Sequence, residues 1–297
     1  MVLVSAAVLL KKAQNEGFAV PAFNSMNLET AQAIVAAAEA QKAPVILQLT
    51  HKTMDYAGLE NSAHFLVPLL RAAKAPMALH LDHGKDFEAV KHCIAAGFSS
   101  VMIDGSRFPL EENIALTSRV VALAQRFDVS VEAEVGALGE SSFTNPTDAL
   151  VFCSSARVNA LAVAVGTSHG AHKFSGKPML NLPLLERIAS LVKVPLVLHG
   201  ASSVEASIIK KAKKFGLHLQ KTSGVPMQQI KKAIKLGVCK INIDTDLRLS
   251  FNIALREYLS KNKADFDARN AFAFARSEMQ KTCEKKIIDF GAKGKAK

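Results

Sequence analysis

Short apolar runs alternate with longer helical patterns along almost the whole of this 297-residue sequence. Each run is too short for a helix and is bounded by proline, glycine or polar residues, so it predicts a strand buried on both faces. The runs end near residues 24, 50, 82, 104, 134, 166, 199 and 244, mostly 22 to 33 residues apart. That spacing fits one strand and one helix per unit, which is typical of a parallel sheet.

Eight such units in a chain of this length favour a closed (β/α)8 barrel, or TIM barrel, over an open doubly wound sheet. The last interval is longer than the others and predicts an extra helix over about 225–236. Residues 265–290 predict a helical C-terminal extension. We therefore expect residues 1–297 to form a single barrel domain, with C-terminal helices from about residue 264.

The composition argues against several classes of protein. No apolar stretch approaches the roughly 18 residues of a membrane span, and Lys11 and Lys12 follow the apolar start of the chain, the wrong order for a secretory signal. The four scattered cysteines suggest neither a disulfide framework nor a zinc knot, so we expect a reduced, cytoplasmic protein. The net charge of +11 comes largely from lysine runs typical of solvated helix faces. Attraction of anionic substrates is a second interpretation, and no nucleic-acid recognition motif accompanies the lysines.

Histidines follow the ends of three predicted strands, at His83, His169 and His199. Other polar residues stand at or just beyond the strand ends: Asn24, Thr50, Asp82, Asp104, Glu134, Asn242 and Asp244. The strand beginnings carry apolar residues or proline instead. Because barrel enzymes build their active sites at the carboxyl ends of the strands, this asymmetry predicts an enzyme.

The residue types at these ends suggest metal chemistry on a phosphorylated substrate. Three histidines and an open position match the ligand count of a catalytic zinc site, and Asp82 beside one of them suits general acid–base work. Asp104 and Glu134 could hold a second cation or orient the ligands. Glycine and hydroxyl clusters over residues 166–170, 200–203 and 242–245 predict backbone anion cradles. We interpret His80, which shares strand parity with Asp82, as a residue that supports the ligands.

Six sequence blocks at these positions resemble the class II, metal-dependent fructose-bisphosphate aldolases. They are HLDHG (80–84), SVMIDGS (100–106), VSVEAEVG (129–136), AVGTSHGAHKF (164–174), PLVLHGAS (195–202) and KINIDTDLR (240–248). The resemblance extends from GFAVPAFN (17–24) to FDAR (266–269), nearly end to end. The tagatose-bisphosphate aldolases share most of these blocks and are the alternative. NIDTDLR and the segment Ser223–Pro226 look more like the fructose enzymes.

The resemblance implies reversible cleavage of fructose 1,6-bisphosphate to dihydroxyacetone phosphate and glyceraldehyde 3-phosphate. It implies that His83, His169 and His199 bind a catalytic Zn²⁺ and that Asp82 is the acid–base group. Asp104 and Glu134 match ligands of a second divalent ion, and a monovalent cation is a further expected cofactor. Substrate binding is implied for Asn24, Thr50, Gly170, Lys173, Gly200, Ala201, Ser202, Asn242, Asp244, Thr245 and Arg269. Arg269 matches an arginine that family members supply from a neighbouring subunit, so a homodimer or larger homo-oligomer is expected.

The sequence departs from the resemblance over residues 137–146, where the family usually has a longer loop that carries a glutamate to the substrate. Glu140 is the best candidate for that proton-transfer role.

Three alternative hypotheses for the function remain. A metal-dependent barrel hydrolase usually places an HxH pair on its first strand, and residues 18–24 have none. A Schiff-base aldolase needs a buried lysine, for which Lys240 is the candidate, near the start of its strand. Surface adhesion through the basic face is a possible second, non-enzymatic role.

Overall fold

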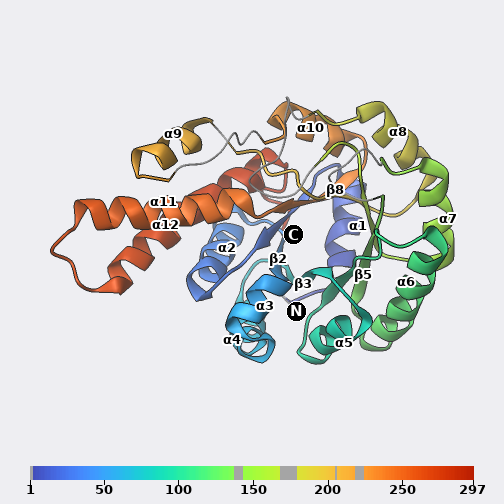
Figure 1. Ribbon diagram of the computed structural model, residues 1–297, viewed down its shortest axis with the longest axis horizontal. Helices are drawn as coiled ribbons and strands as arrows, with labels where there is room; N and C mark the ends of the chain where they lie inside the picture. The colour runs from blue at the N-terminus through green and yellow to red at the C-terminus, as the bar shows by residue number, and fades with distance from the viewer. Residues whose placement is uncertain (1–2, 137–142, 168–178, 205, 218–223) are drawn as a thin grey trace.

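The eight apolar runs form the eight strands of one closed parallel barrel, in which each strand pairs with its neighbour in sequence and β8 closes onto β1. This computed structural model describes residues 3–136, 143–167, 179–204, 206–217 and 224–297 (Figure 1). The strands are β1 (Val20–Asn24), β2 (Val45–Thr50), β3 (Met77–Gly84), β4 (Ser100–Ile103), β5 (Ser130–Val135), β6 (Ala160–Val163), β7 (Leu196–Leu198) and β8 (Val238–Ile243). The predicted barrel class is confirmed.

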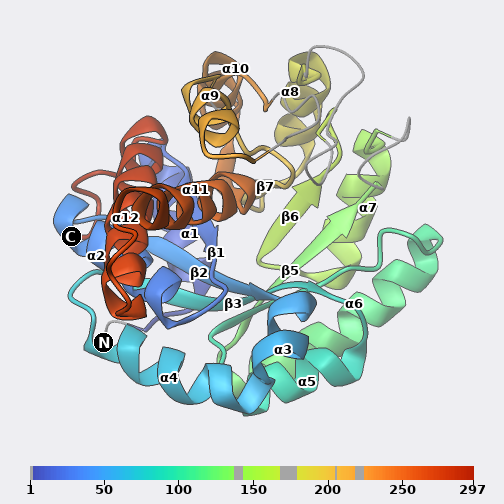
Figure 2. The same ribbon diagram turned by 60° about the vertical axis from the view of Figure 1, so that its left-hand side comes forward.

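Helices follow the strands and surround the barrel (Figures 1 and 2). They are α1 (Ala6–Glu16), α2 (Leu28–Gln41), α3 (His51–Ala57), α4 (Leu59–Ala72), α5 (Phe87–Ala95), α6 (Leu110–Ala124) with the 3₁₀ turn η1 (Gln125–Phe127), α7 (Pro146–Ala156), α8 (Leu182–Leu191), α9 (Ala206–Lys214), α10 (Met227–Lys235), α11 (Thr245–Lys261) and α12 (Ala268–Asp289). The extra helix before β8 is α10, and the C-terminal extension is α12, as predicted.

Local sequence sets the helix ends. Ser5 begins α1 by accepting a hydrogen bond from the Ala7 amide, and Gly17 ends that helix with a φ of 70°, a conformation that glycine adopts without a Cβ clash. The Asn27 and Thr30 side chains form a reciprocal capping box at the start of α2. These short-range contacts fix where α1 and α2 begin and where α1 ends.

The strands are buried on both faces, by the helices outside and by side chains inside. Every residue of β1, β5 and β8 is buried, which accounts for the continuous apolar runs. The barrel interior also holds buried polar side chains, among them Lys240, Glu132 and His80. A barrel interior of this kind is filled by side chains rather than forming a pore.

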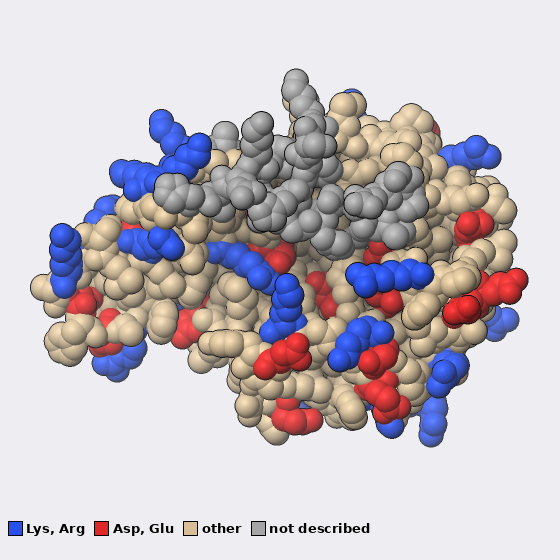
Figure 3. Space-filling view, in the orientation of Figure 1, with Lys and Arg blue, Asp and Glu red and all other residues tan. Residues whose placement is uncertain are grey.

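Helix α12 lies beside α11 and α2, and the α11–α12 pair extends away from the barrel (Figures 1 and 2). Lysine and arginine side chains are interspersed with acidic ones over the face seen in Figure 3, as expected for solvated helix faces. All four cysteines are free thiols, and three of them are buried. Within the ranges that the structure describes, no helix is both long and apolar enough to cross a membrane.

Candidate active site

A backbone irregularity at the end of β3 turns His83 toward the mouth of the barrel. In a regular strand, Asp82 and His83 would point to opposite faces. Instead, the pairing of β3 with β4 shifts register just before Gly84, and His83 has a φ of 52°. Gly84 is required here because a Cβ would lie 2.3 Å from the carbonyl oxygen of Met102. Asp82 and His83 can therefore both join a cluster with His199.

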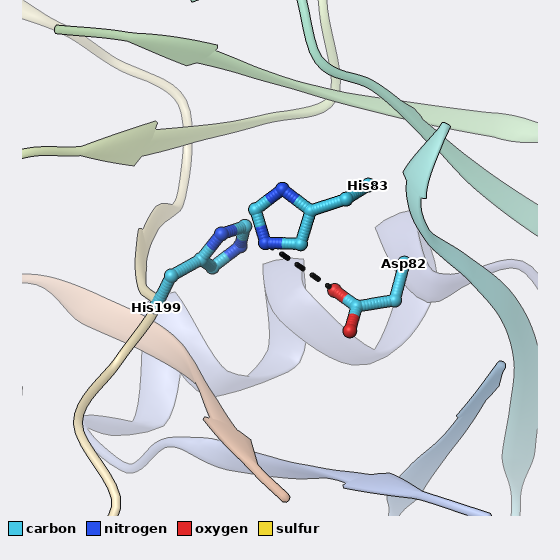
Figure 4. A group of neighbouring side chains, drawn as sticks. All are labelled: Asp82, His83 and His199. Carbon is cyan, nitrogen blue, oxygen red and sulfur yellow. Dashed lines mark ion pairs between the residues drawn. The ribbon is translucent and has the colours of Figure 1, made fainter. Parts of the chain in front are cut away.

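His199 follows β7 and faces His83 edge to face, with ring centroids 4.6 Å apart (Figure 4). Nε2 of His199 is 2.8 Å from Oε1 of Glu132, and its Nδ1 is 3.4 Å from Oε2 of Glu134. Burial alone would lower the pKa of His199, but the hydrogen bonds and negative charges of these two glutamates raise it to about 9. In the metal-free protein the imidazole is therefore protonated at neutral pH.

The Asp82 carboxylate is held in place by two amide side chains. Nδ2 of Asn24 donates to Oδ2 at 2.8 Å, and Nδ2 of Asn242 donates to Oδ1 at 2.9 Å. Burial raises the pKa of Asp82, but electrostatic interactions with His83, His199 and Lys240 and the hydrogen bond from Asn24 outweigh burial and hold the pKa below its usual value. Oδ1 of Asp82 lies 3.9 Å from Nε2 of His83, the contact drawn in Figure 4. Asp82 is thus an ionised, oriented base.

A buried ionic network lies beneath this cluster and was not predicted from the sequence. Nζ of Lys240 is 2.8 Å from Oε2 of Glu132, whose other oxygen contacts His199. Nε2 of His80 is 3.4 Å from the same ammonium, and its Nδ1 is 2.8 Å from Oγ of Ser100. Burial, then the Lys240 charge, lower the pKa of His80 to about 3, so its ring is neutral. Glu132 contacts His199 directly, whereas the polar contacts of His80 are to Lys240, Ser100 and Glu132, so the supporting role expected of His80 stays a prediction.

Strand alternation could have predicted that Glu132 and Lys240 point into the barrel. Glu132 shares parity with Glu134, and Lys240 shares parity with Asn242, so both point inward. Because Glu132 is on β5 and Lys240 on β8, only closure of the barrel brings the two together. The Lys240 ammonium is occupied by a carboxylate, which argues against its use as a Schiff-base nucleophile.

The residues present fit a divalent metal ion. Ligand atoms of Asp82, His83 and His199 lie within 4.8 Å of one another, and so do those of His83, Asp104 and Glu134. Oε2 of Glu134 is buried and lies 3.4 Å from Nδ1 of His199, so a metal ion bound by that imidazole would also be close to this carboxylate. Imidazole and carboxylate donors are the ligands that zinc takes in proteins.

Asp104 orients one of these histidines, with its Oδ2 2.8 Å from Nδ1 of His83. That contact directs Nε2, on the opposite side of the ring, toward the interior of the cluster. Burial raises the pKa of Asp104, but the bonds and charge of His83 and the bonds from Ser106 lower it well below its usual range.

The other predicted residues fall into three groups. Thr50 caps α3, Thr245 begins α11, and Gly200, Ala201 and Ser202 form the turn after β7, so these lie at the mouth. Arg269 lies in the first turn of α12, on the extended α11–α12 pair, where its exposed guanidinium contacts Asp267 at 2.7 Å. Glu140, His169, Gly170 and Lys173 lie outside the described residues.

A cleft of about 450 Å³ lies next to this face, between α3 and α11. Its lining includes Lys52, Tyr56 and Arg248. Nε of Arg248 is 2.7 Å from Oδ1 of Asp244, which connects the cleft to the residues that follow β8. The cleft therefore places two cationic side chains beside the mouth.

Comparison with known proteins decides the family. The family model described as class-II fructose-bisphosphate aldolase matches residues 4–295. The chain belongs to the class II fructose-bisphosphate aldolase family. As a member of it, the chain is an aldehyde-lyase, which confirms the enzyme class predicted from the sequence and excludes the barrel hydrolase.

Curated relatives extend over the full length of this family member. It is 43% identical to the fructose-bisphosphate aldolase of Thermus caldophilus, over 99% of this chain and 100% of the relative. It is 36% identical to the fructose-bisphosphate aldolase of Helicobacter pylori, over 99% of each. The crystal structure of the YdjI aldolase from Escherichia coli K12 matches with a TM-score of 0.85 and 31% identity, over 99% of this chain and 100% of that one.

Proposed function

We propose that the barrel mouth around Asp82, His83 and His199 is where this chain cleaves fructose 1,6-bisphosphate reversibly into dihydroxyacetone phosphate and glyceraldehyde 3-phosphate. The observation that carries this proposal is a single ionised carboxylate, clamped by two amides and facing two imidazoles that can hold a metal. A base and a metal on the same face are what a metal-assisted aldol cleavage requires.

The metal that we propose is zinc, held by His83 and His199 together with His169. Asp104 and Glu134 are proposed to hold a second divalent ion, supported by the grouping of their oxygens with His83. A bound zinc ion would supply Lewis-acid stabilisation of the negative charge that cleavage leaves on the ketose carbonyl oxygen.

Asp82 is proposed to move the proton. Its carboxylate accepts the hydrogen of the C4 hydroxyl as the C3–C4 bond breaks, and it returns that hydrogen in the synthetic direction. Asn24 and Asn242 keep the two oxygens aimed at one position, and the low pKa of Asp82 keeps the group ionised between turnovers. Glu140 is proposed for the second proton transfer, at the carbon that the cleavage leaves negatively charged.

The two phosphates are proposed to bind on opposite sides of this base. The turn of Gly200, Ala201 and Ser202 and the segment from Asn242 to Thr245 suit the phosphate of the dihydroxyacetone half, because a helix begins just behind Thr245. Gly170 and Lys173 are assigned to the same half. The cleft lined by Lys52 and Arg248 suits the other phosphate, which Arg269 of a neighbouring subunit would also reach.

An exposed position for Arg269, at the outer end of the α11–α12 pair, supports a homodimer or larger assembly in which that residue serves a neighbouring site. We also propose a cytoplasmic location, which the four free cysteines support.

A coupled assay tests this function directly. Fructose and tagatose 1,6-bisphosphate are supplied to the protein as isolated, after metal removal, and after zinc is returned. We expect cleavage of the fructose compound to exceed that of the tagatose compound, to vanish with the metal and to recover with zinc. The His83→Ala variant should be inactive, whereas His64→Ala, which changes an exposed histidine on α4, should retain full activity. Borohydride trapping in the presence of substrate, with no effect of chelators, would defeat the proposal.

A further inference from the structure

A buried lysine of the C-terminal helix joins two loops of the mouth from outside the barrel. The Lys286 side chain, on α12, is 5% exposed, and its Nζ is 2.8 Å from Oδ1 of Asp246, which is fully buried. The same ammonium donates a hydrogen bond to the carbonyl oxygen of Ser203 at 3.1 Å. One side chain of α12 thus contacts both the turn that follows β7 and the first turn of α11.

Both contacts lie next to residues assigned above to the phosphate of the dihydroxyacetone half. Ser203 directly follows Ser202, and Asp246 directly follows Thr245. Lys286 does not belong to either loop and follows β8 by more than forty residues, so no local motif accounts for its place here. The contacts of Lys286 with these two loops are therefore what indicate its role.

The Lys286 ammonium is the charge that compensates Asp246. Neither carboxylate oxygen of Asp246 accepts a directed hydrogen bond within the described residues, so the ion pair with Lys286 carries the compensation. A buried carboxylate left without a cation is strongly unfavourable. The pair therefore fixes the start of α11 against α12.

The turn after β7 is held from a second direction by Gly224. A Cβ at Gly224 would lie 2.2 Å from the carbonyl oxygen of Ser202 and 2.5 Å from the amide nitrogen of Val204. The backbone around Ser203 is thus packed against Gly224 while its carbonyl is bound by Lys286. Fixing a carbonyl also fixes the plane of its peptide, and with it the direction of the adjoining N–H.

We propose that Lys286 is a positioning residue for the phosphate end of the substrate site. It acts through Ser203 and Asp246 and does not touch the substrate. It holds the two loops at the separation that lets their backbone N–H groups bind one phosphate together. The inference rests on the proposed function, because that function assigns the phosphate to these loops. Beyond that function, we infer that substrate affinity depends on the packing of α12 against these two loops.

Three variants and one control separate positioning from simple stabilisation. Lys286→Met removes both contacts, and Lys286→Arg retains a cation that can reach both partners. The double variant Lys286→Met with Asp246→Asn removes the charge that Lys286→Met leaves buried, without restoring the contact to Ser203. Lys281→Met makes the same chemical change on the exposed side of α12, where the lysine is 69% exposed. The double variant also serves if Lys286→Met alone does not fold.

The readouts are kcat and KM for fructose 1,6-bisphosphate, the dissociation constant of inorganic phosphate by calorimetry, and the melting temperature. Loss of the Lys286 contacts in Lys286→Met should raise KM and the phosphate dissociation constant about tenfold, with kcat within about threefold of the parent. Lys286→Arg should recover most of the affinity, and Lys281→Met should match the parent. The double variant should regain melting temperature but keep the raised KM.

Recovery of KM together with melting temperature in the double variant would reduce Lys286 to a stability residue and overturn the proposal. An unchanged phosphate affinity in folded Lys286→Met would overturn it as well. Failure of the proposed function looks different. In that case the parent protein does not cleave fructose 1,6-bisphosphate, while calorimetry with inorganic phosphate still reports whether Lys286 controls the anion site.

Discussion

The Glu132→Gln substitution should destabilise the protein severely, although it changes one atom of a side chain that is 3% exposed. Glu132 has 2.8 Å contacts with both Lys240 and His199, and its carboxylate helps to raise the pKa of His199 to about 9 in the metal-free state. The amide keeps the shape but removes the only carboxylate charge in contact with the Lys240 ammonium among the described residues. Removing one partner of a buried ion pair costs about 3–5 kcal/mol.

We therefore expect the free energy of unfolding of metal-free Glu132→Gln to fall by about 3–5 kcal/mol in urea titrations followed by circular dichroism. Glu186→Gln, an exposed change on α8, should stay within about 0.5 kcal/mol of the parent. Adding Lys240→Met to Glu132→Gln should recover part of the loss, because the uncompensated ammonium is gone.

The same substitution should weaken zinc binding, because Glu132 orients a proposed ligand. Loss of such an outer contact lowers metal affinity by about 10–100-fold. A destabilisation below about 1 kcal/mol, together with unchanged zinc affinity, would refute the reasoning that Glu132 both balances Lys240 and aims His199.

Three further predictions follow from the site and the core. Asp82→Asn should lower kcat by about 10²–10⁴-fold in protein that is still folded and still binds zinc; retained activity would exclude Asp82 as the base. Since the pKa of His199 is raised to about 9 in the metal-free protein, zinc must displace its proton. Zinc affinity should therefore rise as the pH increases toward 9, and calorimetry in buffers of different ionisation enthalpy should detect proton release; equal heats would contradict this. Burial raises the pKa of Cys93 to about 12 and of Cys239 to about 11, so a disulfide thiol reagent at pH 8 should label them only after unfolding.

The barrel and the location of the site could be predicted from the sequence because both depend on local patterns. Apolar runs of strand length alternate with helices, and polar residues gather at one end of each run. Helix α3 was missed because it is only seven residues long, lacks an apolar period and begins immediately after β2. Its cap, Thr50, was read only as a substrate-binding residue, although its side chain also accepts a bond from the Thr53 amide.

The contacts inside the site depend on features that a linear pattern does not contain. His83 joins Asp82 only because of a left-handed backbone and a register shift, which strand alternation would not predict. The pairing of Glu132 with Lys240 needs two strands that are far apart in sequence to meet across the barrel interior. Burying such charges is unfavourable unless each is paired, so sequence patterns usually give no reason to expect them.

The central claim is that one divalent ion lies between imidazoles delivered by separate strands. Anomalous diffraction at the zinc absorption edge, from crystals of the zinc-loaded protein, tests it most directly. We predict a peak within bonding distance of both His83 Nε2 and His199, with a third ligand from His169, and no such peak in His83→Ala crystals. A zinc peak remote from His83 and His199, or full zinc occupancy at an unchanged position in His83→Ala, would contradict the account.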